Sequence, residues 1–159
     1  MRVILSIEAI RPPLAGIGRY AWELAQGLPR QAEVSEVRYI ADGFWRAKPG
    51  LAQVQTPAPV VSQTAVRPGL RQRLAGSRLV SASYAQLQPL LTGWQANRLA
   101  KSVFHGPNFT IPRTRQACVV TIHDLSTYHN PAWHPANRVM RMNKVIPESL
   151  QRADRKSVV

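Results

Sequence analysis

Apolar positions along this chain follow two spacings, and each spacing predicts one kind of element. Four short apolar runs rich in β-branched residues predict buried strands: residues 3–7, 37–41, 102–105 and 119–122. Apolar residues three and four positions apart predict three helices: residues 17–28, about 84–99 and 136–152. Residues 157–159 have the pattern of a strand's beginning. Strands alternating with helices predict an α/β fold with a parallel sheet and helices on both faces.

Proline and tryptophan positions refine these helices. Pro29 ends the first helix, Pro89 lies near the first turn of the second, and Pro147 kinks the third. The spacing of Trp94 in the second helix predicts that it packs in the core. Over residues 46–70 the periodicity is weak, which predicts a long loop with a short strand at 51–55, followed by a basic helix at 71–79.

Length and composition indicate one globular domain over residues 1–159, with 45% hydrophobic residues. No apolar run is long enough to span a bilayer. Cys118 is the only cysteine, so no disulfide forms within the chain, and the pattern predicts a cytoplasmic protein. Cys118 itself is expected to be buried.

The charge is strongly unbalanced, with 21 Lys and Arg against 8 Asp and Glu and a formal net charge of +13. Such an excess favours anionic partners, namely phosphates, nucleic acid or an acidic membrane surface. The alternative is that many single arginines are only solvated. No nucleic-acid-binding motif accompanies the charge, so we expect no nucleic-acid partner.

His123 and Asp124 directly follow the apolar run 117–122. Ligands of parallel α/β sheets bind at the carboxyl ends of strands, so this pair lies where chemistry is usually found. His123 is the candidate acid, base or hydrogen-bond partner of a substrate. Asp124 either orients it or caps the following segment. A serine hydrolase is not indicated, because no G-x-S-x-G motif is present.

Gly16 and Gly18 match the phosphate-binding pattern G-x-G-x-x-A before the first helix. A helix start offers bare N–H groups to a phosphate, whereas the plainer alternative is a turn that only begins a helix. Asp42 ends the second strand, where a ribose-binding acid would lie. Residues 8–15 separate the glycines from the first strand, which argues against a nicotinamide-dependent oxidoreductase.

A second candidate loop is His105-Gly106-Pro107-Asn108, at the end of the strand predicted at 102–105. His105 and Asn108 can present donors and acceptors there, or the loop is an ordinary connection with His105 bonded to backbone. The four histidines lack the spacing of a zinc site, so we expect no metal.

Five segments, in this order along the chain, resemble the N-terminal domain of retaining GT-B glycosyltransferases of family four. Within that family, the chain is most similar to mannosyltransferase-like members. The five segments lie at 1–9, 12–20, 105–109, 119–126 and 146–155. The resemblance covers nearly the whole chain and implies the acceptor-side half of a two-domain enzyme. The Gly-Ile-Gly-Arg-Tyr and His-Asp-Leu segments carry most of its specificity.

The resemblance also implies roles for single residues. Gly16, Gly18 and Arg19 would face the diphosphate of a GDP- or UDP-sugar, and His123 would reach the donor sugar. His105, Asn108 and Asp124 would line the acceptor side of the cleft. The acceptor would be a glycan or lipid-diphosphate, with no cofactor or metal. The basic surface would then contact the anionic inner face of the cell membrane peripherally.

The same resemblance implies a donor-binding C-terminal domain, which this sequence lacks, so we expect a truncated chain that is inactive alone. Electrostatic stabilisation of the leaving group is usually the largest catalytic contribution, and the residues that supply it would lie in that domain. A non-catalytic basic binding module is the alternative from a different functional class.

Overall fold

The fold is known from a computed structural model that describes residues 1–14, 16–50 and 78–158. The strand expected at 51–55 and nearly all of the helix expected at 71–79 lie outside these residues. The described strands form one sheet in the order β3-β2-β1-β4-β5-β6. Their bounds are β1 Arg2–Ser6, β2 Glu36–Ala41, β3 Phe44–Arg46, β4 Ser102–Gly106, β5 Ala117–Ile122 and β6 Arg155–Val158.

Every neighbouring pair in this sheet is parallel except β2 and β3. The predicted α/β fold with a Rossmann-like, mostly parallel sheet is therefore confirmed. The antiparallel β3 was not expected. Asp42 and Gly43 both have positive φ, at 55° and 82°, and Ala41 pairs with Phe44. These two residues form a tight hairpin turn, and Asp-Gly is a preferred sequence for such turns.

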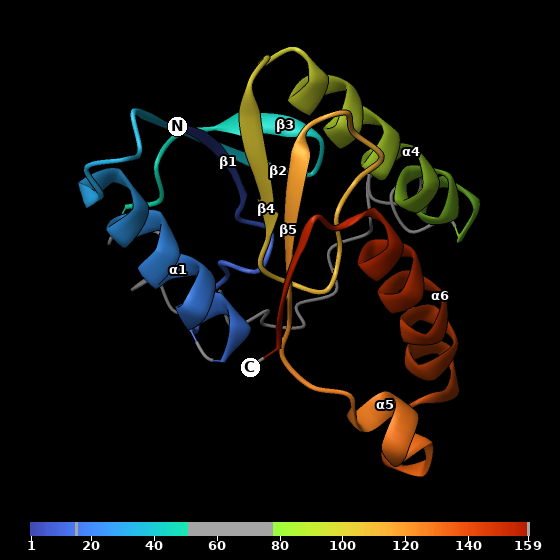
Figure 1. The fold of residues 1–159 in the computed structure, drawn as a ribbon. Coiled ribbons are helices and arrows are strands. Elements are labelled where there is room, and N and C mark those ends of the chain that lie inside the picture. Colours follow the sequence, from blue (N-terminus) through green and yellow to red (C-terminus); the bar gives the residue numbers. More distant parts are fainter. Residues whose placement is uncertain (15, 51–77, 159) are drawn as a thin grey trace, which may run out of the picture.

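Helices cover both faces of the sheet, with α1 on one side and α4 and α6 on the other (Figure 1). Their bounds are α1 Ile17–Gly27, α4 Arg78–Asn97, α5 Ser126–His129 and α6 Ala136–Arg152, with 3-10 turns η1 Leu28–Arg30 and η2 Pro131–Trp133. The helix predicted at 136–152 is confirmed. α4 begins earlier than predicted, so Pro89 lies well inside it, and the short α5 was not predicted.

Alternate strand residues face opposite layers, as the pleat of a sheet requires. Ile4, Phe104 and Val120 pack toward the larger cluster with Ile146 of α6. Leu5 and Tyr39 form the smaller cluster with Ala25 of α1. Cys118 is buried, as expected. No helix within the described residues is both long and apolar enough to cross a membrane.

The expectation that Trp94 packs in the core is wrong, since its side chain is 56% exposed. Small side chains face the sheet instead, with Thr92 and Ala96 buried. A Cβ atom at Gly93 would collide with the backbone carbonyl of Arg113. The close approach of α4 to this segment therefore selects small residues inside and leaves the large ones outside.

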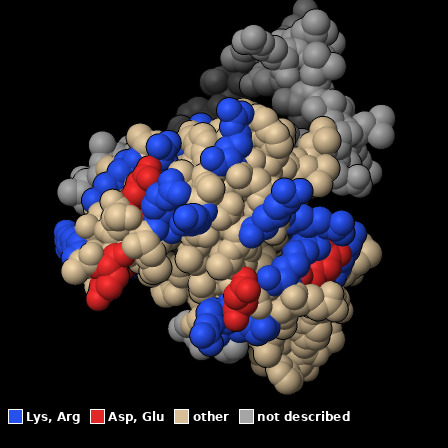
Figure 2. Space-filling model, turned by 45° about the horizontal axis from the view of Figure 1, so that its top comes forward, with Lys and Arg blue, Asp and Glu red and all other residues tan. Residues whose placement is uncertain are grey.

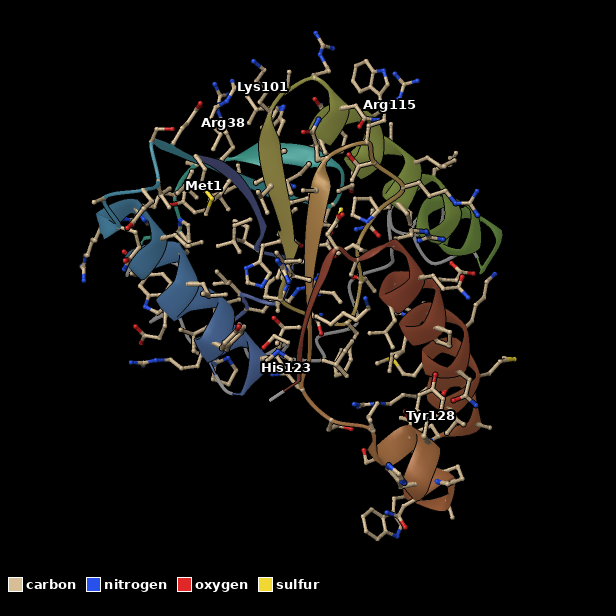
Figure 3. The ribbon with its side chains drawn as sticks, in the orientation of Figure 1. Met1, Arg38, Lys101, Arg115, His123 and Tyr128 are labelled. Atoms are coloured by element: carbon tan, nitrogen blue, oxygen red, sulfur yellow. The ribbon has the colours of Figure 1, made fainter. Side chains whose placement is uncertain are left out.

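The parallel strands bring their carboxyl ends to one edge of the sheet. His123 lies at this edge, whereas Arg38, Lys101 and Arg115 lie at the opposite one (Figure 3). The candidate site is built at the edge that carries His123.

Candidate functional site

His123 is held on three sides just beyond the end of β5. Its ring lies edge-on to Tyr20, with centroids 5.0 Å apart, and edge-on to Phe109, with centroids 5.9 Å apart. Its Nε2 lies 2.8 Å from the Pro107 carbonyl oxygen. Because a carbonyl only accepts, Nε2 carries a proton and donates it, which in the neutral tautomer leaves the lone pair on Nδ1. Nδ1 is the nitrogen with which His123 can accept a hydrogen bond from a ligand.

A row of buried and half-buried polar side chains supports this arrangement from the α1 side of the sheet. Thr121 is fully buried, and its Oγ1 lies 3.1 Å from Nε2 of His105 and 3.3 Å from the hydroxyl of Tyr20. Burial lowers the pKa of His105 to about 4, so its ring is neutral at pH 7. These contacts assign His105 a supporting position behind Tyr20. Its role in lining the acceptor side stays a prediction.

The loop after β4 supplies the carbonyl that fixes His123. A Cβ atom at Gly106 would collide with the Thr110 carbonyl, so the loop folds back sharply on the strand. The N–H of Phe109, which has a φ of 60°, donates to the Thr121 carbonyl at 3.1 Å. This bond ties the loop to the end of β5. Asn108 is half-buried within the loop, and its contact with an acceptor stays a prediction.

The start of α1 lies beside His123, because Tyr20 belongs to its first turn. Gly16 is exposed with a φ of 49°, and nothing lies within 4 Å of where its Cβ would be. Gly18 is buried, and its Cβ would come within 2.7 Å of the Ala9 carbonyl oxygen. The close approach of the Ala9 carbonyl therefore accounts for a glycine at position 18. At Gly16, by contrast, the space beside the backbone at the helix start is unfilled. Arg19 is exposed and pairs with Glu23 at 2.7 Å.

Asp124 is exposed and bonds to Ser126, the first residue of α5. Its Oδ1 accepts from the Ser126 hydroxyl at 2.5 Å and from the Ser126 N–H at 2.9 Å. The hydroxyl bond, followed by the N–H bond, lowers the pKa of Asp124. The N-cap residue of α5 is Leu125, without a side-chain cap, so Asp124 forms a turn with Ser126 just before the helix and is not its cap. Its place in the acceptor cleft stays a prediction.

Ser126 also lies 2.8 Å from Nε2 of His134. The serine therefore stands between the acid and the histidine, whereas a hydrolytic triad needs the histidine in the middle. Across the described ranges, no three His, Cys, Asp or Glu side chains gather as metal ligands.

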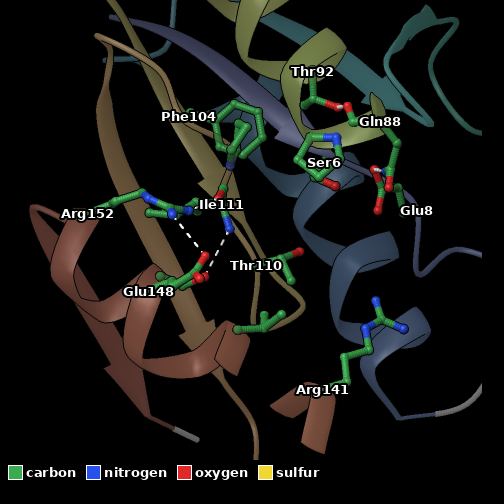
Figure 4. A pocket seen from close by; sticks show the side chains of 14 residues that line it. Ser6, Glu8, Gln88, Thr92, Phe104, Thr110, Ile111, Arg141, Glu148 and Arg152 are labelled. Carbon is green, nitrogen blue, oxygen red and sulfur yellow. Dashed lines mark hydrogen bonds and ion pairs between the residues drawn. The ribbon is translucent and has the colours of Figure 1, made fainter. Parts of the chain in front are cut away.

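A pocket of about 350 Å³ opens between α4, α6 and the sheet (Figure 4). Its polar walls come from β1 and the following loop, from α4, and from α6: Ser6, Glu8, Gln88, Thr92, Arg141, Glu148 and Arg152. Thr110 borders the pocket, and its neighbour Phe109 borders His123. One loop therefore joins the two sites.

Glu8 is the functional candidate that our sequence interpretation missed. Its Oε1 accepts from Nε2 of Gln88 at 2.5 Å and from the N–H of Asp42 at 3.4 Å. Burial raises the pKa of Glu8. The available signal was its position, since it lies two residues after a buried strand at the carboxyl edge.

Arginines complete the pocket on the α6 side. Arg152 pairs with Glu148 at 2.9 Å and donates to the Ile111 carbonyl at 3.4 Å (Figure 4). Arg141 is exposed at the pocket wall. The pocket thus combines carboxylates, an amide and guanidinium groups, a set that both accepts from and donates to the hydroxyls of a ligand.

Comparisons with known proteins support the mannosyltransferase-like part of the resemblance drawn from the motifs. Over 153 residues the chain is 31% identical to the O-antigen chain mannosyltransferase B of Escherichia coli. The match covers 96% of this chain and 39% of that relative. No family model and no solved structure matches the chain. The chain is therefore similar to one part of a bacterial mannosyltransferase.

Proposed function

We propose that this chain supplies the acceptor-side domain of a glycosyltransferase. The enzyme would transfer a hexose, mannose by similarity, from a nucleoside-diphosphate sugar to a glycan or lipid-diphosphate acceptor. The observation that carries the proposal is the 31% identity to a mannosyltransferase over 96% of the chain. The retaining GT-B type of family four rests on the motif resemblance alone.

In this proposal His123 positions the donor sugar. Its Nε2 is occupied by the Pro107 carbonyl, so its Nδ1 would accept a hydrogen bond from a sugar hydroxyl. The rings of Tyr20 and Phe109 restrict its rotation. Such preorganisation favours the transition state, because no reorientation is needed when the bond to the leaving group breaks.

The start of α1 would receive the donor diphosphate of a GDP- or UDP-sugar. Gly16 is exposed there, and the helix start presents N–H groups and the positive end of the dipole. Gly18 would act by letting the preceding loop pack closely. Arg19 would exchange Glu23 for the diphosphate, since both side chains are more than half exposed and such pairs are weak.

The pocket beside α4 and α6 would hold the acceptor. Glu8 and Gln88 would bond to sugar hydroxyls, and Arg141 would pair with an acceptor phosphate. His105, Asn108 and Asp124 would complete the cleft wall. With a lipid-diphosphate acceptor, the protein would work in peripheral contact with the anionic inner face of the membrane.

Sugar transfer by the full-length gene product that carries this chain tests the proposal. GDP-mannose is compared with UDP-glucose on lipid-diphosphate acceptors, and the anomeric coupling of the product reports retention. We expect His123→Ala to lower kcat at least a hundredfold and His129→Ala, an exposed histidine of α5, to leave it unchanged. Undiminished transfer by His123→Ala would remove the role given to His123.

A basic binding module without catalysis is the second candidate, and the net charge of +13 favours it. Lack of transfer with every donor, in a protein that still binds anionic glycans or lipids, would support this candidate and contradict sugar transfer.

A further inference from the structure

The helix α4 carries large apolar side chains on its outer face. Leu87, Leu90, Leu91 and Trp94 are 55%, 58%, 40% and 56% exposed. Their spacing of three, four and seven residues places them along one side of the helix. We call these four residues the α4 stripe. Grouped apolar side chains on a surface mark an interaction site, whereas single ones are common.

The opposite side of α4 faces the protein and is polar or small. Gln88 and Thr92 line the pocket, and Ala96 is fully buried. The usual arrangement of a surface helix, with large apolar residues inside, is thus inverted over these turns. An apolar partner outside the domain would bury the α4 stripe.

Positive charge surrounds the end of the stripe. The Arg98 guanidinium lies 4.7 Å from the centre of the Trp94 ring. The Arg113 backbone lies against Gly93, and the N–H of Arg115 donates to Oδ1 of Asn97 at 2.8 Å. All three arginines are exposed, as is Lys101. Figure 3 shows Lys101 and Arg115 projecting from the same end of the molecule.

Negative charge is scarce along this part of the chain. The sequence from Gly43 to His123 contains no Asp or Glu. On the face shown in Figure 2, lysine and arginine side chains cover far more surface than acidic ones. The partner of the stripe must therefore tolerate or prefer dense positive charge beside apolar side chains.

We propose that the α4 stripe and its flanking cations dock on an anionic lipid bilayer. Leu87, Leu90 and Trp94 would enter the boundary between headgroups and acyl chains, while the cations would meet lipid phosphates. Charge complementarity selects this partner, because a second copy of a chain with net charge +13 would be repelled. The proposal deepens the membrane contact included in the proposed function by naming its surface.

The position of α4 connects this surface to the pocket. Gln88 faces the pocket, and its neighbour Leu87 faces outward, whereas Leu91 is partly exposed and also borders the turn at Gly43. A bilayer on the outer face would lie one helix diameter, about 10 Å, from the pocket wall. An acceptor anchored in that bilayer would reach the pocket without leaving the membrane.

Vesicle flotation with the chain tests the proposal. We use vesicles of phosphatidylcholine with 30% phosphatidylglycerol, and pure phosphatidylcholine vesicles for comparison. We expect binding at least about tenfold stronger to the anionic vesicles, falling as salt is raised from about 50 to 300 mM. The double variant Leu87→Gln/Leu90→Gln should bind at least about tenfold more weakly. Trp133→Gln, which changes an exposed residue of η2, should bind as the unaltered chain does.

Circular dichroism establishes that each variant is folded before its binding is interpreted. Arg98→Gln/Lys101→Gln gives an independent measurement, since it should weaken binding to anionic vesicles and reduce its dependence on salt. Equal binding to both vesicle types, or unchanged binding by the folded leucine variant, would overturn the proposal. Dimers of the chain that the leucine variant disrupts would also overturn the proposal, because a second copy would then cover the stripe. Vesicle binding is measured without substrate, so failed sugar transfer with retained binding contradicts only the proposed function.

Discussion

Two histidines, one within β4 and one just beyond the end of β5, differ in their surroundings. His123 gives one nitrogen to a backbone carbonyl and is half-buried at the sheet edge. His105 lies against Thr121, and burial lowers its pKa to about 4. The first arrangement leaves a nitrogen for a ligand, and the second keeps a neutral ring inside the structure. Each makes a measurable prediction.

For His123 we expect the tautomer with the proton on Nε2. Donation to the Pro107 carbonyl requires it, and the fixed loop between Gly106 and Thr110 maintains that carbonyl. Two-bond ¹⁵N–¹H correlation spectra at pH 7.5 identify the protonated nitrogen. His123→Gln, whose amide can still donate to this carbonyl, should preserve the fold better than His123→Ala. A proton on Nδ1 would contradict the assigned geometry.

For His105 we expect stability to fall with acid over a defined window. Its pKa is about 4 in the fold against an ordinary value of 6.5, because burial disfavours the charged ring. The unfolded chain therefore binds a proton at higher pH than the folded chain does. The stability that depends on neutral His105 is complete above pH 6.5 and is lost as the pH falls toward 4. The loss is on the order of 3 kcal/mol.

Urea unfolding at pH 7 and pH 4.5 measures this loss. His105→Gln, which cannot titrate, should lose less stability between the two values than the unaltered chain. His129→Gln serves as the control, because His129 is exposed. Equal acid sensitivity in the chain and in His105→Gln would refute the assignment.

Among the loops, the turn after β4 fixes the site most tightly. A methyl group at Gly106 would collide with the Thr110 carbonyl, so we expect Gly106→Ala to lower the free energy of unfolding by about 1–3 kcal/mol. Gly27→Ala is the matched control, since nothing lies within 4 Å of its Cβ and its backbone is helical. That change should be neutral or stabilising by up to about 1 kcal/mol. Chemical denaturation compares the two, and equal effects would contradict the close approach.

Elements with long, regular patterns were predictable from the sequence, and those set by tertiary contacts were not. The helix at 136–152 has clear periodicity, and the structure reproduces its bounds. The hairpin at Asp42-Gly43 was missed because those residues were interpreted only as a strand's end, although Asp-Gly predicts such a turn. The outward stripe of α4 could not be predicted, because periodicity identifies a face without saying which way it points.

The position of His123 at the sheet edge was predictable, whereas its contacts were not. The rule that ligands bind at carboxyl ends of strands located His123. It did not reveal that Tyr20, Phe109 and Pro107 surround its ring, since Tyr20 comes from α1 and the other two come from the loop after β4. Gly18 matches a phosphate-binding pattern, yet the nearby Ala9 carbonyl alone accounts for a glycine there.

At the scale of the whole molecule, the excess of 21 basic over 8 acidic residues predicts that salt stabilises the fold. Compact folding brings like charges together, and salt screens their repulsion. The described ion pairs oppose this trend only weakly, because pairs such as Arg19–Glu23 and Arg38–Glu36 are largely exposed. We therefore expect Tm to rise as sodium chloride goes from about 20 to 300 mM, by about 2–4 °C for each kcal/mol gained.

Scanning calorimetry at fixed pH measures this rise, and charge reduction supplies its control. Arg98→Gln/Lys101→Gln removes two exposed cations from a segment without acids, so its Tm at low salt should lie above that of the unaltered chain. The two proteins should converge at high salt, where repulsion is screened. A Tm that falls with salt would mean that attractive ion pairs dominate the surface. Convergence would instead show that the positive charge lowers stability, and an anionic ligand that bound these cations would then stabilise the fold.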